Sequence, residues 1–376
     1  VTGYKTGDKI LKNFAANLMN MQGLHTRVTA DHFLTMLAYD QDSNYVIENV
    51  SRNVEQFTMS RSVQSEDIKV VLRTGIYFVE ENCTNIDTAI DNANITRQSI
   101  GQTFSNEIAV YNEAFVRQKS LQSKILARME PSLENGDFQV WMQPKIDLKT
   151  GELCGAEALS RWMNNGTVCF YPDEFIPIFE NNGFITSLDL YVLETVCKNI
   201  AQWKELGWDD MARISINLSV MDIMRDGVVD SIKRIVNRYH VDYKLLEFEL
   251  TETGYFQNFN TAAYVMKELQ DLGFFTSVDD FGSGYSVMNM LVNMSANTIK
   301  IDRAFMLNSI KTKAGCTLLE RIIGIVHELG YSVLCEGIET QEQLDLLRKM
   351  GCDEGQGYLF AKPMPMNEYF NTYKNR

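Results

Sequence analysis

Two adjacent acidic residues, Asp279 and Asp280, follow a β-rich run and precede a glycine-punctuated loop in the segment SVDDFGSGYS, residues 277–286. An α/β barrel carries its chemistry at such strand ends. Two neighbouring carboxylates repel one another by roughly 4 kcal/mol at about 4 Å and an effective dielectric constant of about 20, so water or a cation must relieve the repulsion. Taken alone, the pair also suits a helix cap or a solvated turn.

The other predicted strands end in polar residues as well, and any one of them has an ordinary structural explanation. They are Glu157, Asn217, Glu249, Lys300, Glu336 and Gln356. Carboxylate and amide oxygens from several strand ends are how a barrel assembles a site for a hard cation such as Mg²⁺ or Mn²⁺. The seven cysteines form no CxxC pair and the four histidines are dispersed, so a zinc site or a disulfide framework is not expected.

The chemistry that suits such a rim is metal-assisted hydrolysis of a phosphodiester. Divalent cations neutralise phosphate oxygens, lower the pKa of a bound water and stabilise the leaving alkoxide. Lys300 would supply a compact positive charge for a phosphate or for the attacking hydroxide. With no histidine among the candidates, a carboxylate or the metal itself must manage the proton.

The elements that position these residues alternate between strands and helices from Phe138 to the C-terminus. Eight β-rich runs within about 240 residues, separated by amphipathic helical stretches, predict an α/β fold of the (β/α)8 TIM-like type. A doubly wound open sheet is the alternative, but no strand is followed by its GxGxxG phosphate turn. The predicted boundaries are an α/β sandwich over residues 1–115, a helical linker over 116–134 and the barrel over 135–376.

The N-terminal region predicts helices over residues 7–19 and 87–98 and strands over 27–37 and 68–78. The sequence begins immediately before the first predicted helix, which suggests that a first strand and helix of such a fold lie outside the chain. Residues 104–134 are polar and largely helical, with Leu121, Ile125 and Met129 on one stripe. Both a passive spacer and a signal-carrying helix remain open for this segment.

Composition narrows the function classes. The 376 residues are 45% hydrophobic and 22% charged, which is typical of a globular protein of about two domains. A net charge of −14 argues against a polynucleotide partner, which needs a basic footprint. No apolar run is long enough to span a bilayer and no signal peptide is present, so a cytoplasmic location is expected. A membrane anchor preceding residue 1 in a longer protein stays open.

The motifs after residue 130 occur in the same order as in the EAL domain, a family of bacterial phosphodiesterases. The resemblance covers residues 130–370. Its matching segments are Glu157-Ala158-Leu159 with Arg161 and Trp162, NLS at Asn217, ELTE at 249–252, DDFGSGYS at 279–286, KID at Lys300, EGIE at 336–339 and QGYLF from Gln356. The resemblance implies metal-dependent hydrolysis of cyclic di-GMP to linear pGpG. It also implies that the first barrel strand runs antiparallel to the others.

The resemblance further implies a role for each matching residue. Glu157, Asn217, Glu249 and Asp279 would bind a first Mg²⁺ or Mn²⁺ ion, and Asp279, Asp280 and Glu336 a second. Lys300 would hold the catalytic water, Glu336 would be general base or metal ligand, and Glu252 would anchor the loop over residues 281–286. The substrate-binding positions are Gln143, Arg161, Gln356 and Glu339, with Gln356 also supporting Glu336. A homodimer through the EAL domain is expected.

The N-terminal region resembles the C-terminal two-thirds of a GGDEF diguanylate cyclase domain, with departures at its signature. Thr29 and Ala30 stand where glycine backbone should approach a triphosphate, and His32 replaces a metal-binding carboxylate. The inhibitory RxxD site is absent, with Asn20 and Gly23 at its ends. We therefore expect a degenerate domain that makes no cyclic di-GMP and serves regulation or dimerisation. Binding of GTP as a weak effector stays open.

Two function classes follow for the whole chain: an active phosphodiesterase, or a catalytically silent receptor or scaffold for cyclic di-GMP. Silent relatives usually lack a ligand carboxylate, the lysine or the loop, and this chain retains all three. The sequence therefore favours the enzyme. Formation of pGpG in the presence of Mg²⁺ discriminates between the two.

Overall fold

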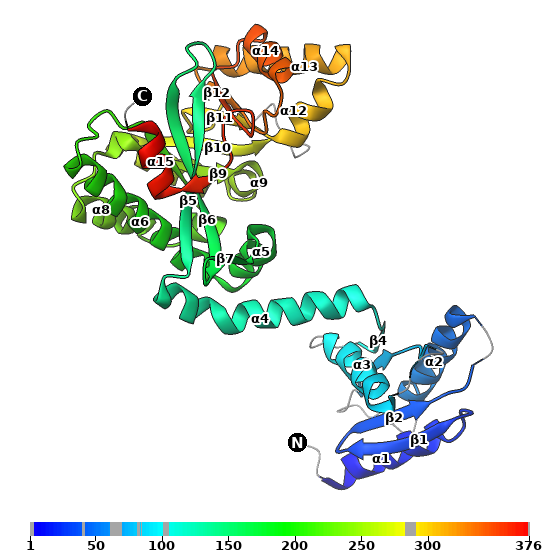
Figure 1. The fold of residues 1–376 in the computed structure, drawn as a ribbon. Coiled ribbons are helices and arrows are strands. Elements are labelled where there is room, and N and C mark those ends of the chain that lie inside the picture. Colours follow the sequence, from blue (N-terminus) through cyan, green and yellow to red (C-terminus); the bar gives the residue numbers. More distant parts are fainter. Residues whose placement is uncertain are drawn as a thin grey trace. The chain divides into compact units, whose positions relative to one another are not determined.

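The chain folds into two compact units in a computed structural model. The N-terminal unit comprises Val1–Lys124 and the barrel unit comprises Ile125–Arg376 (Figure 1). No helix in the described part of the chain is both long and apolar enough to cross a membrane. The structure describes residues 4–39, 42–60, 70–80, 83, 85–100, 105–282 and 291–374.

The N-terminal unit has two small sheets with helices packed beside them. Strands β1 and β2 form an antiparallel hairpin, and β3 and β4 form a parallel pair. Phe14 links the helices to the hairpin, because its ring lies 4.9 Å from the ring of Phe57 and 5.0 Å from that of Phe33. The elements are α1 (Tyr4–Leu18), β1 (Leu24–Thr29), β2 (His32–Met36), α2 (Ser43–Thr58), β3 (Arg73–Ile76), α3 (Ile86–Ser99) and β4 (Glu107–Val110).

The predicted helices over residues 7–19 and 87–98 are present as α1 and α3, and the strand region 27–37 lies within the β1–β2 hairpin. The strand expected over 68–78 is confined to β3 in its described part. Helix α2 was not predicted, although its apolar residues recur at helical spacing and two of them, Val54 and Phe57, are buried. Strand β4 was not predicted either, because residues 107–110 were assigned to the helical connector; their pairing with β3 makes them a strand.

Helix α4 (Glu113–Asn135) covers most of the segment expected to be helical, and the division between the two compact units falls within it. Ile125, on the predicted apolar stripe, is fully buried. The domain boundaries given above remain predictions, since the contacts divide the chain by compactness alone.

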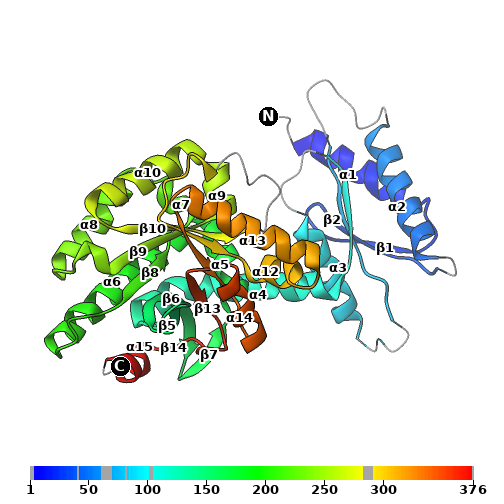
Figure 2. The same ribbon diagram turned by 90° about the horizontal axis from the view of Figure 1, so that it is seen from above.

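The barrel unit contains a closed sheet of eight strands, seen from above in Figure 2. The sheet closes because β5 pairs with β6 as well as with β13. Strand β5 is antiparallel to both neighbours, as the family resemblance predicted. The eight strands are β5 (Phe138–Asp147), β6 (Leu153–Asn164), β8 (Arg213–Asn217), β9 (Leu246–Thr251), β10 (Phe275–Phe281), β11 (Thr298–Ile301), β12 (Ser332–Cys335) and β13 (Glu354–Gln356), with β7 (Thr167–Phe170) and β14 (Met364–Pro365) extending the sheet. This confirms the TIM-like barrel and its eight predicted strands.

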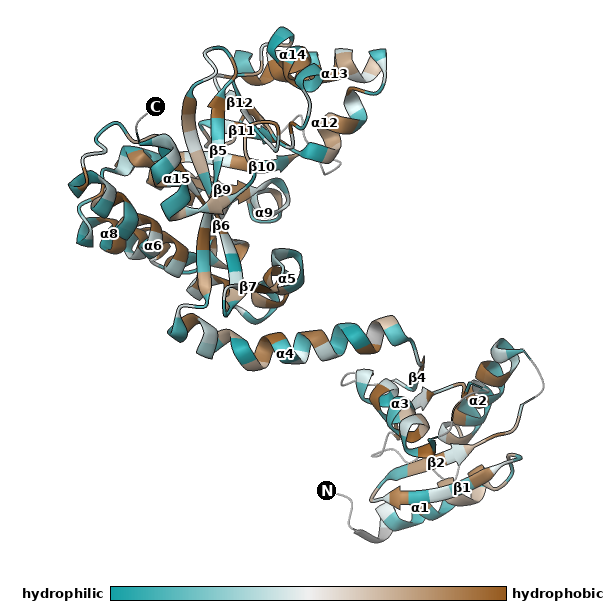
Figure 3. Ribbon diagram, in the orientation of Figure 1, coloured by the Kyte–Doolittle hydropathy of each residue, from teal (hydrophilic) through white to brown (hydrophobic). Residues whose placement is uncertain are grey.

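Amphipathic helices pack around the sheet, and Figure 3 shows them with brown and teal faces. Apolar residues at helical spacing are buried in both α6 (Leu193, Val196) and α13 (Leu319, Ile322), in line with the amphipathic stretches predicted between the strands. The helices and turns are α5 (Pro172–Asn182), α6 (Ile185–Glu205), α7 (Val220–Ile223), α8 (Val228–Arg238), η1 (Tyr243–Leu245), α9 (Glu252–Gln257), α10 (Phe259–Leu272), α12 (Arg303–Ser309), α13 (Lys313–Glu328), α14 (Gln341–Lys349) and α15 (Met366–Tyr373).

The interior of this barrel is unusually polar. Branched apolar side chains dominate the core of most TIM barrels. Here the buried residues include Gln143, Lys145, Glu157, Glu247, Glu249, Asp279, Lys300 and Gln356. Charged side chains are almost never fully buried unless they are paired. Buried charged and amide side chains therefore occupy much of the barrel interior.

Candidate functional site

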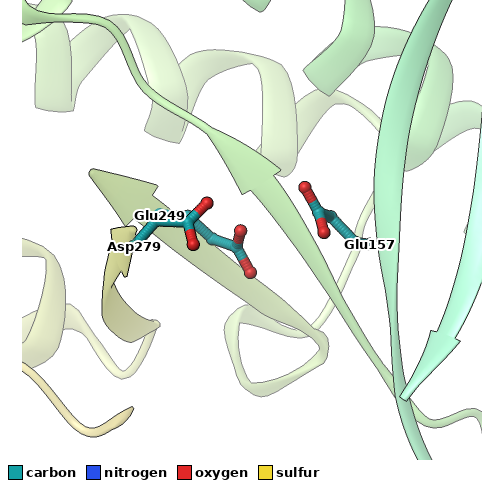
Figure 4. Close-up of side chains that lie close together, drawn as sticks. All are labelled: Glu157, Glu249 and Asp279. Atoms are coloured by element: carbon teal, nitrogen blue, oxygen red, sulfur yellow. The ribbon is translucent and has the colours of Figure 1, made fainter. Parts of the chain in front are cut away.

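Three carboxylates from three strands converge inside the barrel. Glu157 comes from β6, Glu249 from β9 and Asp279 from β10, and their oxygens lie within 4.8 Å of one another. Figure 4 shows the three side chains pointing toward a shared space. Parallel neighbouring strands produce this convergence: β9 pairs with β10, and Ser277, two residues before Asp279 on the same face, lies opposite Glu249.

A second acidic group shares Asp279 with the first. It consists of Asp279, Asp280 and Glu336, again with ligand atoms within 4.8 Å of one another. Asp280 has a positive φ of 57°, an uncommon conformation for a non-glycine residue. In this conformation the Asp280 N–H donates to Asp279 Oδ1 at 2.8 Å. The two adjacent acids thus face the same site, as predicted.

Lys300 lies at the centre of the acidic residues and is fully buried. Its Nζ is 2.5 Å from Glu249 Oε2, 3.0 Å from Asp279 Oδ2, 2.9 Å from Glu336 Oε1 and 3.5 Å from Glu157 Oε2. Each of these four carboxylates comes from a different strand or strand end. One ammonium group therefore contacts four of the five predicted acidic positions, all except Asp280.

The electrostatics differ between the acids because their cationic partners differ. Burial by itself raises the pKa of Glu249, but Lys145 and Lys300 outweigh it and lower that pKa to about 2. Burial raises the pKa of Asp279 well above its usual range, with Lys300 opposing and the neighbouring carboxylates adding. Burial also raises the pKa of Glu336, against the effect of Lys300. The pKa of Glu249 is lowered and that of Asp279 is raised because Glu249 contacts two ammonium groups, whereas Asp279 contacts one.

The four carboxylates in turn keep Lys300 charged. Burial would lower the pKa of its ammonium group, but the surrounding acids outweigh burial and raise the pKa well above its ordinary value. The predicted positive charge at this position is therefore retained at all physiological pH values.

Amide side chains complete the arrangement. Gln356 Nε2 donates to Gln143 Oε1 at 3.0 Å and to Glu157 Oε2 at 2.7 Å, and Asn217 Nδ2 donates to Glu157 Oε1 at 3.2 Å. Gln356 Oε1 is buried with no hydrogen-bond partner among the described residues. An all-oxygen donor set with an unsatisfied acceptor beside it fits a hard divalent cation, of the Mg²⁺ or Mn²⁺ type, better than zinc.

Three further predicted residues make contacts outside the acidic group. Glu252 Oε2 accepts from the N–H of Gly282, at the start of the loop it was expected to anchor. The rest of that loop, residues 283–286, lies outside the described residues. Arg161 lies over the ring of Trp141 at 5.8 Å. Glu339 is not brought into the acidic group and instead pairs with Arg303 at 2.7 Å.

A layer of charged residues that was not predicted lies behind the predicted site. Lys145 Nζ lies 2.7 Å from Glu249 Oε1 and 3.8 Å from Glu247 Oε2, and Arg213 Nε lies 3.2 Å from the same Glu247 oxygen. Lys145 and Gln143 are two residues apart, as are Glu247 and Glu249, so each pair shares a face of its strand. This period of two could have predicted the second layer, because it places Lys145 and Glu247 on the same faces as the predicted site residues.

The fold and the site define a TIM-like barrel with an acidic, lysine-centred rim. Residues 126–363 match the sequence profile of the EAL domain, so the chain belongs to the EAL domain family.

Relatives extend this similarity. The signaling protein YkoW of Bacillus subtilis is 26% identical over 372 residues, which are 98% of this chain and 46% of YkoW. A cyclic di-GMP phosphodiesterase of Pseudomonas aeruginosa is 35% identical over 227 residues, which are 60% of this chain and 38% of that protein. The chain thus spans less than half the length of these two relatives.

Solved structures show the same fold. The PaMucR phosphodiesterase in complex with c-di-GMP is 28% identical, with a TM-score of 0.61 over 65% of this chain and 99% of its own. An EAL domain protein from Listeria monocytogenes is 27% identical, with a TM-score of 0.59 over 67% of this chain and 98% of its own. Both similarities cover a share of the chain close to that matched by the family profile.

Proposed function

We propose that this chain hydrolyses cyclic di-GMP to linear pGpG with the help of Mg²⁺ or Mn²⁺. The observation that carries the proposal is the convergence of Glu157, Glu249, Asp279 and Glu336 on Lys300 inside the barrel. Membership of the EAL domain family and the similarity to a phosphodiesterase in complex with c-di-GMP support the choice of substrate.

In this proposal the two acidic groups hold one or two ions. Glu157, Asn217, Glu249 and Asp279 would hold the first, and Asp279, Asp280 and Glu336 the second. A bound divalent cation supplies charge neutralisation of the phosphate and a lower pKa for water. The chain's own contribution is to fix the oxygens: Asn217 and Gln356 each donate to one oxygen of Glu157, and the Asp280 N–H donates to Asp279.

In this proposal Lys300 positions the attacking water and Glu336 accepts its proton. Lys300 stays protonated, so it positions a water oxygen as a hydrogen-bond donor and cannot take a proton from it. Glu336 lies 2.9 Å from Lys300 and has a raised pKa, which makes its carboxylate the better proton acceptor of the pair. Both of the predicted duties of Glu336, general base and metal ligand, are compatible with this position.

Substrate contacts are assigned to residues at the edge of the acidic centre. Arg161 would bind a phosphate oxygen of cyclic di-GMP, since its guanidinium is a planar donor suited to phosphate. Gln143 and Gln356 would line the substrate beside Glu157. Glu339, paired with Arg303, would contact substrate only after leaving that ion pair, and Glu252 would hold the start of the loop at Gly282.

The test is the conversion of cyclic di-GMP to pGpG, followed by chromatography, with Mg²⁺, with Mn²⁺ and with EDTA. We expect product with either metal and none with EDTA. E249Q removes one site charge and should be inactive, whereas D271N makes the same change in an exposed ion pair on α10 and should be fully active. Binding of cyclic di-GMP by the wild type without any product would instead establish the silent receptor.

For the N-terminal unit we propose a degenerate GGDEF-like domain with a regulatory or dimerising role. The sequence Thr29-Ala30-Asp31-His32-Phe33 forms the turn and flanks of the β1–β2 hairpin, and Ala30 has a positive φ of 43°. Arg27 Nε donates to the Ala30 carbonyl at 2.6 Å, closing the turn. A Cβ in a position that favours glycine supports loss of the triphosphate contact. The homodimer, the GTP effector and membrane anchoring of a longer protein stay predictions.

A further inference from the structure

Glu249 is held by two ammonium groups that play different parts. Lys300 contacts Oε2 and shares its charge among four carboxylates. Lys145 contacts Oε1 at 2.7 Å and has one further carboxylate nearby, Glu247 at 3.8 Å. The two oxygens of Glu249 therefore face different surroundings: Oε2 faces the acidic centre, and Oε1 faces the charges behind it.

Lys145 is firmly held, as Lys300 is, because both side chains are buried and ion-paired. It lies on β5, where the register places it opposite Gly155 of β6 on one side and Gln356 of β13 on the other. Its carbon stem crosses Gly155 so closely that a Cβ there would lie 3.3 Å from Lys145 Cδ. Its ammonium is buried between Glu249 and Glu247. Strand pairing, packing and charge thus all hold Lys145 in one position.

The other two carboxylates of the first acidic group also have an oxygen engaged, by neutral donors. Asp279 Oδ1 accepts from the Asp280 N–H, and Glu157 Oε1 accepts from Asn217. Lys145 is the charged member of these donors. A charged, buried hydrogen bond is the hardest of the three to give up, because breaking it leaves a charge without its partner.

We propose that Lys145 determines which divalent cation the site accepts, by holding Oε1 of Glu249 so that this carboxylate offers a metal one oxygen only. Mg²⁺ takes six ligands in near-ideal octahedral geometry, to which single carboxylate oxygens are suited. Ca²⁺ takes six to eight ligands and often binds a carboxylate through both oxygens. A metal bound through Oε2 displaces Lys300, which keeps three other carboxylates within 3.5 Å. Chelation of Ca²⁺ by both oxygens of Glu249 would in addition break the Lys145 ion pair and leave that ammonium with Glu247 at 3.8 Å. Lys145 is therefore a positioning residue that discriminates against Ca²⁺.

The inference rests on the proposed metal site, and its test needs no cyclic di-GMP. Isothermal titration calorimetry measures the Kd of Mg²⁺ and of Ca²⁺ for wild type, K145M and the control R213M. R213M also removes one cation from the barrel interior, but Arg213 contacts Glu247 and Glu354 and not Glu249. We expect K145M to lower the ratio of Ca²⁺ Kd to Mg²⁺ Kd by about tenfold or more, the range in which groups behind a metal ligand act. R213M should leave the ratio unchanged.

The outcomes separate the two proposals. If wild type binds neither ion, the metal site is wrong and this inference falls with it. If the ions bind and K145M keeps the wild-type ratio, or R213M shifts it as much as K145M does, the role of Lys145 is wrong while the site stands. Should K145M not fold, infrared difference spectra of the wild type decide, with the Glu249 band assigned by its loss in E249Q. A single-oxygen carboxylate band with both ions supports the proposal, and a bidentate band with Ca²⁺ overturns it.

Discussion

The two units of this chain differ in whether their charged residues are buried or exposed. In the barrel unit, carboxylates and lysines are buried together, and Lys300 contacts four acids. In the described part of the N-terminal unit, the buried residues are apolar except for Thr96, and the hairpin turn at 29–32 is exposed. Its Asp31 and His32 lie 3.8 Å apart at side-chain exposures of 78% and 47%.

The difference follows from sheet closure. A closed barrel directs side chains from eight strands into one interior, so each charge finds several opposite charges within reach. A two-stranded hairpin has no enclosed interior, and its polar residues face water. Exposed ion pairs contribute little to the stability of the fold, whereas a buried charge without its partner destabilises the fold strongly. Function that depends on perturbed charges is therefore expected in the barrel and not in the hairpin.

The largest expected effect comes from removing a carboxylate of the barrel centre. E157A or D279A should lower the rate of pGpG formation by about 10³-fold or more, because each removes a proposed oxygen ligand and, with it, a charge stabilisation of several kcal/mol. Circular dichroism checks that the fold survives, as expected for side chains that line the site. Substantial turnover by either folded variant would show that the residue is not a ligand.

Substitution of Arg161 tests the edge of the site. R161M should raise the KM for cyclic di-GMP by about 10- to 100-fold, since a hydrogen bond to a charged group contributes about 1.5–3 kcal/mol. The affinity for Mg²⁺ should change less than the KM, because within the described residues Arg161 forms no ion pair with a carboxylate and interacts with Glu157 only at longer range. R234M, at an exposed position on α8, is the matched control. An unchanged KM in R161M would remove the phosphate contact from the proposal.

A smaller effect concerns a pair of acids in the barrel unit, half-buried Asp189 on α6 and buried Asp222 on α7. Burial raises the pKa of Asp189 well above its usual range, and the charge of Asp222 and their hydrogen bond add to it. A raised folded-state pKa contributes stability below the unfolded pKa of 3.8, and that contribution is lost as the pH rises through the folded pKa. Wild type should therefore lose stability across this window.

The variant D189N replaces the titrating group with a neutral amide that donates to Asp222. Its melting temperature at pH 8 should exceed that of wild type, by about 2–4 °C for each kcal/mol gained, and the difference should shrink at pH 4. Differential scanning calorimetry at the two pH values measures this. A lower melting temperature for D189N at pH 8 would show that the Asp189 charge is stabilised in the fold.

The smallest expected signal comes from the N-terminal unit. The D279A variant, expected to degrade no cyclic di-GMP, should accumulate none from GTP and Mg²⁺, because in the proposed GGDEF-like domain Thr29, Ala30 and His32 replace the residues that would contact phosphate and metal. Mass spectrometry of the reaction, with an active diguanylate cyclase as positive control, provides the measurement. Accumulation of cyclic di-GMP would contradict the degenerate reading of the hairpin turn and remove the contrast between the units.

Much of the barrel follows from local sequence. The period of two in the strands and the period of 3.6 in helices such as α6 and α13 are set by backbone geometry, so eight strands and their order were predictable. Parallel strands end at one rim, and so Glu157, Glu249 and Asp279 could be expected together from the sequence alone. Helix α2 and strand β4 were missed although their patterns are local. Their apolar stripes are short, and no recognised motif falls within residues 43–58 or 107–110.

What the tertiary structure alone decided is which charges pair. Lys145 and Glu249 are 104 residues apart, and their contact depends on the antiparallel placement of β5, which no periodicity in β5 itself encodes. The pairing in turn gives Glu249 two cationic partners and Asp279 one, and this separates the pKa values of two acids that look equivalent in the sequence. Sequence determines which side chains face the interior, because strands alternate. Closure of the sheet determines which of them meet, because only then do strands far apart in the chain share one enclosed, weakly solvated space.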